Sequence, residues 1–346
     1  MQAPHGRPPA VCVFLSLDGA VFAESEAQVV TRCLITGASG FIGSALTNAL
    51  QQAPGYQLKL VGRQLKALPQ EPHLQAIKID AINGGTEWAA AVENIDVVVH
   101  AAARVHVMQE TAQDALAAFR STNTEGTLRL ALQAADAGVH RFVFLSSIGV
   151  LGNGGNTVYT EQSDPTPTTP YAVSKCEAED GLRKIAEHTG MEVVIIRPPL
   201  VYGPRAPGNF GRLANLVQRG TPLPLGGVQN LRSLVSIENL VDFIKTCMLH
   251  PAAGNQTFLV SDGDDLSTPA LVRRMARAMG TNAPLFKLPL PVLHLAASLV
   301  GKRSMLQQLT GSLQVDCRKA NTRLGWTAPY SVDESLRRTF QKPTTP

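Results

Sequence analysis

The sequence predicts an α/β fold in which helices cover both faces of a doubly wound parallel sheet, followed by a smaller C-terminal lobe. Six short apolar or β-branched runs alternate with helical stretches between residues 31 and 199, as expected for strands buried on both faces. A glycine-rich turn, TGASGFIG at residues 36–43, joins the first run to the first helix. With 346 residues, of which 44% are hydrophobic, the chain can bury a core of this size.

The expected strands each end in small or polar residues. In order they are residues 31–36, 56–62, 74–80, 95–103, 141–147 and 192–198. Between them, residues 115–138 and 171–190 have the composition and spacing of long helices. The alternation of strands and helices predicts a first domain over residues 30–199.

Beyond residue 199 the alternation weakens, because prolines and glycines crowd the segments 197–212 and 220–230. Residues 200–346 are expected to form mainly a smaller lobe at the ends of the sheet, with some elements returning to the sheet. Residues 1–29 fit a secretory signal poorly, since prolines precede their apolar stretch and Asp18 interrupts it. We interpret them as a disordered or over-long extension outside the fold.

Composition and charge argue against several classes of protein. The net charge of +4 is spread along the chain without runs of Lys and Arg, which disfavours nucleic-acid binding. The five cysteines are widely separated and lack metal-ligand spacing, which indicates reduced thiols in the cytoplasm and no metal site. The apolar stretch 288–301 is shorter than the roughly 20 residues of a spanning helix. We expect an amphipathic core helix there, with a membrane-surface contact as the less favoured alternative.

The glycine-rich turn predicts a dinucleotide site. Gly37, Gly40 and Gly43 follow a strand and open a helix, where they permit a tight turn, a close approach of pyrophosphate and close helix–strand packing. The helix N-terminus then offers free N–H groups to the phosphates. The cofactor-binding residues expected in this turn are the three glycines with Ser39, Phe41 and Ile42. The alternative is a loop that only turns the chain.

The ends of the next strands indicate which dinucleotide binds. The second strand ends in LVGRQ, without the acidic residue that binds the ribose of NAD. Arg63 could instead pair with a 2′-phosphate, so NADP(H) is favoured and NAD(H) remains possible; alternatively, Arg63 points to water. Asp80 is placed to accept from the adenine amino group. Ala101 and Ala102 supply a floor of small residues for a flat cofactor.

The segment PYAVSK at 170–175 predicts the catalytic pair. Hydride transfer at a carbonyl carbon needs an acid or base near its oxygen. Tyr171 could serve if its pKa fell, and Lys175, one helical turn along, could lower that pKa together with the positive charge of the cofactor. Ser147, at the end of the strand RFVFLSS, could hold the same oxygen. The Tyr-x-x-x-Lys spacing alone would also fit an ordinary helix.

With these residues in this order, residues 31–340 resemble the extended short-chain dehydrogenase/reductase family, and within it the NAD-dependent epimerase/dehydratase branch. The resemblance implies that Asn123, in STNTEGT, lies by the cofactor and supports the active-site helix and a relay water. It implies that the segment of Arg197, in IIRPPLVYGP, passes the nicotinamide ribose. Asn209 and Arg232 would bind the diphosphate of a UDP-sugar, with surface solvation as their alternative. It also implies a homodimer through the helices at 115–138 and around Tyr171.

Family likeness and residues together favour chemistry at C4 of a UDP-hexose. Ser147 is followed by Ile148 and Gly149 rather than the acidic pair of the dehydratases, which argues against dehydration. The segments around Asn209 and residues 101–108 look most like reductases that make UDP-N-acetylquinovosamine from a UDP-4-keto-6-deoxy-N-acetylhexosamine for polysaccharide synthesis. We therefore expect a reductase; a UDP-glucose or UDP-N-acetylglucosamine 4-epimerase is the alternative. His106 and Met108 could line the sugar pocket or a packed loop.

A third possibility is a regulator that senses NADP without catalysis. Such a protein would keep the glycine-rich turn but would need no catalytic groups. The complete set of Ser147, Tyr171 and Lys175 argues against it.

Overall fold

The structure, a computed structural model, describes residues 30–63, 73–105, 114–155, 157–299, 301 and 303–341. The predicted extension 1–29 and the residues His106 and Met108 lie outside this part of the chain.

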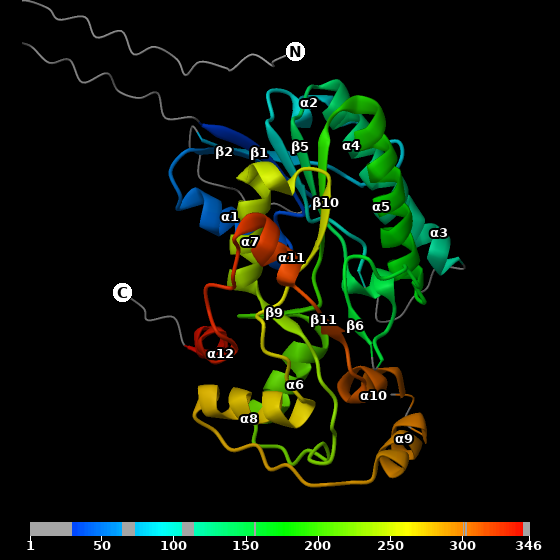
Figure 1. Cartoon of the computed structure of the whole chain (residues 1–346), viewed down its shortest axis with the longest axis vertical. Coiled ribbons are helices and arrows are strands. Elements are labelled where there is room, and N and C mark those ends of the chain that lie inside the picture. The colour runs from blue at the N-terminus through cyan, green and yellow to red at the C-terminus, as the bar shows by residue number, and fades with distance from the viewer. Residues whose placement is uncertain are drawn as a thin grey trace, which may run out of the picture.

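A seven-stranded parallel sheet forms the centre of the molecule (Figure 1). From one edge to the other its strands are β3 (Leu74–Lys78), β2 (Tyr56–Gly62), β1 (Thr31–Thr36), β4 (Val97–His100), β5 (Arg141–Leu145), β7 (Glu192–Arg197) and β10 (Gln256–Leu259). The order reverses direction at β1 and β4, where open parallel sheets bind ligands. The predicted doubly wound α/β fold is confirmed.

Helices cover both faces of the sheet (Figure 1). One layer contains α1 (Phe41–Gln51), α7 (Ile237–Leu249) and α11 (Arg318–Leu324). The other contains α2 (Ala89–Val92), α4 (Gly126–Asp136) and α5 (Pro170–Thr189), with α3 (Ala115–Arg120) and the π-helical turn η1 (Ser121–Glu125) leading into α4. The central strands β4, β5 and β7 are buried on both faces, which explains their continuous apolar runs, whereas the edge strand β3 is partly exposed.

The C-terminal half forms a lobe and also returns to the sheet. Helices α6 (Gly208–Gln218), α8 (Thr268–Met279) and α12 (Val332–Phe340) pack around a separate apolar cluster. The short parallel pairs are β8 (Leu200–Tyr202) with β9 (Leu234–Ser236), and β6 (Val158–Tyr159) with β11 (Gln314–Val315). Two 3₁₀ turns are η2 (Ile148–Leu151) and η3 (Pro251–Ala253). The six predicted strands are thus joined by β10, and α7 and α11 pack on the sheet.

The apolar stretch 288–301 differs from the expectation of a core helix. It forms α9 (Leu290–Leu299), followed by α10 (Arg303–Thr310). Leu293 is buried, but Leu290, Val292, Leu295 and Leu299 are exposed. Within the described part of the chain, no helix has both the length and the apolar character needed to span a bilayer.

Candidate active site

The turn between β1 and α1 has room only for glycine at two positions. Gly37 has φ +70°, and a Cβ there would lie 2.7 Å from the backbone nitrogen of Ala102. A Cβ on Gly43 would lie 2.1 Å from the carbonyl oxygen of Gly37. The turn is therefore pressed against both the start of α1 and the segment after β4, as a dinucleotide site requires.

The N-terminus of α1 is open to an anion. Among the described residues no side chain caps this helix, whereas Thr169, Ser236 and Ser267 cap α5, α7 and α8. The first N–H groups of a helix have no partner within the helix, so those of α1 can bind a phosphate. Ser39 and Gly40 are exposed at this turn, and Phe41 and Ile42 are half-buried behind it.

The other predicted cofactor residues lie at the carboxyl ends of neighbouring strands. Arg63 follows β2 and is exposed, and Asp80 follows β3 and is exposed. Ala101 and Ala102 follow β4 and are half-buried. Because β3, β2, β1 and β4 are adjacent, these residues share one edge of the sheet with the glycine-rich turn. This arrangement fits an extended dinucleotide, and the individual contacts stay predictions.

Helix α5 positions the predicted catalytic pair, Tyr171 and Lys175. Thr169 caps it by accepting from the backbone nitrogen of Ala172 at 3.2 Å, and proline at the next position favours the first helical turn. Lys175 is 1% exposed; its Nζ donates to the carbonyl oxygen of Leu145 at 2.8 Å and lies 4.3 Å from the centre of the Phe144 ring. Burial lowers the pKa of Lys175 to about 7, and Glu179 partly opposes this shift.

Burial of Tyr171 opposes the fall in pKa that the phenol would need in order to act as a base. Burial raises the pKa of the phenol to about 12, and a hydrogen bond with Ser147 partly opposes the rise. Ser147 caps η2, because its Oγ accepts from the backbone nitrogen of Gly149 at 3.1 Å. The structure therefore brings Ser147 and Tyr171 together. Deprotonation of Tyr171 needs added positive charge, such as that of an oxidised nicotinamide.

Asn123 ties the catalytic helix to the loop after β4. Its Nδ2 donates to Ser174 Oγ and to the carbonyl oxygen of Arg104, each at 3.0 Å, and its Oδ1 accepts from the Arg104 nitrogen at 2.8 Å. Asn123 lies in the π-helical turn η1, a kind of helical irregularity often found at functional sites. The implied support of the active-site helix is present; the relay water and the cofactor contact stay predictions.

A buried histidine extends this network to the first strand. His100, at the end of β4, is fully buried between Thr36 Oγ1 at 2.7 Å and Thr127 Oγ1 at 2.9 Å. Thr127 donates to the carbonyl oxygen of Asn123 at 2.7 Å, so it accepts from Nε2–H of the histidine and leaves Nδ1 to accept from Thr36. Hydrogen bonds thus run from β1 through His100 to η1, and from Asn123 to α5.

Arg197 lies beneath the catalytic helix. It is 3% exposed, and its Nε and Nη2 donate to the carboxylate of Glu179 at 2.9 and 2.5 Å. Ser146 Oγ donates to the same carboxylate at 2.6 Å. The structure thus gives Arg197 a role in fixing α5 to β7, while a direct contact with the cofactor stays a prediction.

Asn209 and Arg232 both meet the segment around α10. Asn209, in the first turn of α6, donates from its Nδ2 to Gln308 Oε1. Arg232 donates from Nη1 to the carbonyl oxygen of Gly311 at 2.9 Å, and burial lowers its pKa. The two predicted substrate residues thus both contact residues 308–311 of the lobe.

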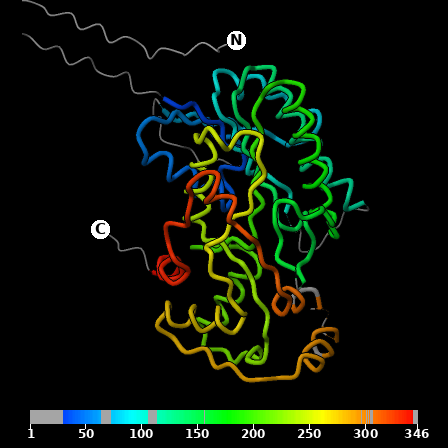
Figure 2. The backbone as a smooth tube through the Cα atoms, viewed as in Figure 1, coloured from blue at the N-terminus to red at the C-terminus, as the bar shows by residue number. Residues whose placement is uncertain are grey.

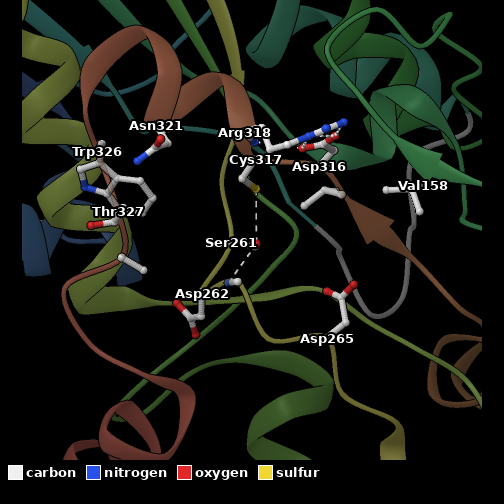
Figure 3. Close-up of a pocket in the computed structure, with 13 residues that line it drawn as sticks. Val158, Ser261, Asp262, Asp265, Asp316, Cys317, Arg318, Asn321, Trp326 and Thr327 are labelled. Atoms are coloured by element: carbon white, nitrogen blue, oxygen red, sulfur yellow. Dashed lines mark hydrogen bonds and ion pairs between the residues drawn. The ribbon is translucent and has the colours of Figure 1, made fainter.

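A cavity of about 640 Å³ lies between the segment that follows β10 and residues 315–328, and none of the predicted site residues lines it (Figure 3). Three carboxylates line it, and each has a partner: Asp262 accepts from Tyr202, Asp265 from Ser233, and Asp316 from Arg318. Among the described residues, no group of three or more His, Cys, Asp or Glu could hold a metal ion. These carboxylates therefore serve the local structure.

Sequence reasoning missed the residues that hold the catalytic groups, chiefly His100, Ser174 and Glu179. A histidine directly after the apolar run VVV was a usable signal, because a buried polar side chain needs partners. Glu179 lies four residues after Lys175, so its position on the same helix face was also visible. Its partner Arg197 could not be inferred from spacing.

Comparison with known proteins agrees with this geometry. Residues 33–261 match the NAD dependent epimerase/dehydratase family. A UDP-glucose 4-epimerase of Vibrio cholerae is 43% identical over 313 residues, which cover 89% of this chain and 94% of that protein.

Two solved structures have the same fold. UDP-glucuronic acid 4-epimerase from Bacillus cereus, in complex with NAD, superposes with a TM-score of 0.73 at 20% identity, covering 90% of this chain and 97% of that one. MoeE5 in complex with UDP-glucose and NAD gives 0.71 at 25% identity, covering 89% and 97%. As its glycine-rich turn and its Tyr171–Lys175 pair implied, the chain belongs to the NAD dependent epimerase/dehydratase family.

Proposed function

We propose that the protein is a UDP-hexose 4-epimerase that keeps NAD bound through its cycle. The observation that carries this proposal is the 43% identity to the Vibrio cholerae UDP-glucose 4-epimerase along nearly the whole of both chains. The set of Ser147, Tyr171 and Lys175 provides the groups that such a reaction needs. The reductase favoured by the sequence is therefore the second candidate, and the epimerase, its stated alternative, is the first.

Tyr171 is the proposed acid and base of the reaction. Bound oxidised NAD supplies the hydride acceptor, and its charge favours the Tyr171 phenolate. Tyr171 would take the proton of the C4 hydroxyl as the sugar is oxidised at C4, and Ser147 would hold the same oxygen. Once the 4-keto sugar has turned over, Tyr171 would return the proton to that oxygen as C4 is reduced on its other face. Protons and electrons balance over the cycle, so no cofactor is consumed.

The diphosphate of the substrate is proposed to bind Arg232 and Asn209. Arg232 is half-buried, and burial lowers its pKa. Within the described part of the chain its guanidinium forms no ion pair with a carboxylate, and such a guanidinium is suited to a phosphate. Gln308, the partner of Asn209, lies in α10. A shift of α10 would thus free the Asn209 amide for the same diphosphate.

Arg63 is the observation that keeps the reductase as a candidate. Its exposure at the end of β2 leaves it available to a 2′-phosphate, which would suit an exchangeable NADP(H). Two further proposals rest on the family: a homodimer formed through α4 and α5, and a cytoplasmic location. Light scattering of the purified chain tests the first, and a monomer at micromolar concentration would contradict it.

Two assays on one preparation separate the candidates. The protein is given UDP-galactose without added cofactor, and formation of UDP-glucose is followed by NMR. In parallel it is given NADPH and a UDP-4-keto-6-deoxy-N-acetylhexosamine, and absorbance near 340 nm is followed. We expect interconversion in the first assay and no stoichiometric loss of absorbance in the second.

The variant Tyr171→Phe tests the proposed acid and base, and two other results of the assays would favour the other candidate functions. Tyr171→Phe should retain the nucleotide and lose turnover by about 10²- to 10⁴-fold, the usual contribution of a positioned acid or base. Loss of NADPH absorbance without interconversion would make the protein a reductase. Cofactor binding without turnover in either assay would favour the non-catalytic regulator.

A further inference from the structure

An apolar stripe is exposed on α9 and the segment before it. Five of the exposed large hydrophobic side chains lie between residues 286 and 299: Phe286 (48%), Leu290 (39%), Val292 (49%), Leu295 (64%) and Leu299 (80%). Val292, Leu295 and Leu299 are spaced three and four residues apart and therefore share one face of the helix. Leu293, on another face, is buried. Such a concentration of exposed apolar side chains marks a contact surface.

The same part of the chain carries only positive charge. Residues 266–315 contain six Lys and Arg and no Asp or Glu, although the whole chain has a net charge of only +4. Lys287 and Arg303 lie on either side of α9, and both are exposed. The apolar stripe is thus flanked by cations, and no carboxylate of this segment is available to neutralise them.

We propose that α9 docks on the surface of an anionic lipid bilayer, with its apolar stripe at the boundary between headgroups and acyl chains. Apolar side chains flanked by Lys and Arg are the features by which interfacial helices bind such membranes. The ten residues of α9 make a helix of about 15 Å, roughly half of the ~30 Å needed to span a bilayer. The helix therefore lies on the membrane and does not cross it.

The position of α9 supports this occupant over a second copy of the chain. Figures 1 and 2 show α9 at the far end of the lobe, reached by the chain that runs along that end from α8, while α4 and α5 lie on the sheet. The dimer proposed through α4 and α5 would use other helices than α9. Two copies facing each other across α9 would bring Lys287 and Arg303 close to like charges, which is unfavourable.

Docking of α9 would place the predicted substrate residue Asn209 near the membrane. Helix α9 packs against α10, and Gln308 of α10 accepts from Asn209. The lipid contact and the predicted substrate residues therefore share one structural unit of the lobe.

Vesicle flotation tests the proposal without using the enzymatic reaction. The full-length protein is mixed with vesicles of phosphatidylglycerol or of phosphatidylcholine, at low and at raised salt. We expect binding to phosphatidylglycerol that weakens with salt, and binding to phosphatidylcholine at least about tenfold weaker. Failure to bind phosphatidylglycerol at low salt would overturn the proposal, whatever the result of the epimerase assay.

Variants separate the apolar from the ionic contribution. Leu295→Glu combined with Leu299→Glu, and separately Lys287→Glu combined with Arg303→Glu, should each weaken binding at least roughly tenfold. Leu249→Glu is the matched control, because Leu249 is 52% exposed but lies at the end of α7. Thermal melting confirms that each variant folds. Unchanged binding in both double variants, or an equal loss in the control, would refute the docking of α9.

Light scattering tests whether the apolar stripe instead binds a second copy of the chain. A dimer that dissociates on Leu295→Glu and Leu299→Glu, in a protein that does not float with either vesicle, would assign the stripe to a second copy of the chain.

Discussion

His100 should make the folded protein sensitive to acid. Its imidazole is fully buried and bonded on both ring nitrogens, to Thr36 and to Thr127. Burial first, and the positive charge of Lys175 second, lower its pKa from 6.5 to about 3. The folded state therefore holds this side chain neutral, while the unfolded state protonates it freely below pH 6.5.

The size of the effect follows from the two pKa values. Between pH 6.5 and 3 the unfolded state binds more protons than the folded state, so the free energy of unfolding falls as pH falls. The loss is about 1.4 kcal/mol per pH unit in this window. Between pH 7 and 4.5, His100 alone should thus cost about 3 kcal/mol.

Urea unfolding of the wild type and of His100→Gln, at pH 7 and at pH 4.5, measures this cost. Glutamine does not titrate but can still donate and accept between the two threonines. The wild type should lose about 3 kcal/mol more than the variant, because all other titrating groups are common to both proteins. Equal losses in the two proteins would show that His100 is not held neutral and would refute the hydrogen-bond scheme.

Three further predictions concern the turn, the ion pair beneath α5 and the lysine. Gly43→Ala forces a Cβ to within 2.1 Å of the Gly37 carbonyl oxygen; calorimetry should show at least about tenfold weaker NAD binding, and undiminished binding would contradict the tight turn. Arg197→Met removes one of the two arginines that pair with the buried Glu179 carboxylate and leaves Arg183 at 2.8 Å, so it should lower the free energy of unfolding by up to about 3 kcal/mol, whereas adding Glu179→Met should recover part of it. Urea unfolding checks both, and equal losses in the single and double variants would count against the pair. The pKa of Lys175 in the folded state is lowered to about 7. Between pH 7 and 9.5 the free energy of unfolding should therefore rise by roughly 3 kcal/mol more in the wild type than in Lys175→Met. Urea unfolding at the two pH values measures this difference, and an equal change in both proteins would contradict it.

The sheet was predictable because its signal is local. All six strands expected between residues 31 and 199 are present, since strands buried on both faces are short runs of Val, Ile, Leu and Phe. Strand β10 was not assigned, because its four residues, QTFL, follow a region crowded with turns. For α9 the sequence predicted a helix correctly but not its exposure, because an apolar run does not reveal which of its sides has a neighbour.

The site residues, like the strands, could be predicted only where their signal is local in the sequence. Gly37, Gly43, Tyr171 and Lys175 were identified because their chemistry requires fixed spacing within one turn or one helix. Glu179 has two arginine partners: Arg183 lies four residues along the same helix, but Arg197 comes from a strand 18 residues away, and spacing gives no sign of it. For Tyr171, the sequence pointed to charges that could lower its pKa, whereas the burial that raises this pKa is visible only in the structure.

The hydrogen bonds that hold α5 are buried, whereas the one that holds Asn209 in the lobe is exposed, and this difference suits the proposed epimerisation. An epimerase has to hold its acid and base still while the keto-sugar turns between two hydride transfers. The catalytic helix α5 is fixed from three directions by buried groups: Asn123 from η1, the Leu145 carbonyl oxygen from β5 and Arg197 from β7. The Asn209 contact with α10 is, by comparison, exposed to solvent. Exposed hydrogen bonds exchange with water at little net cost, so the substrate side can rearrange around a sugar without moving Tyr171.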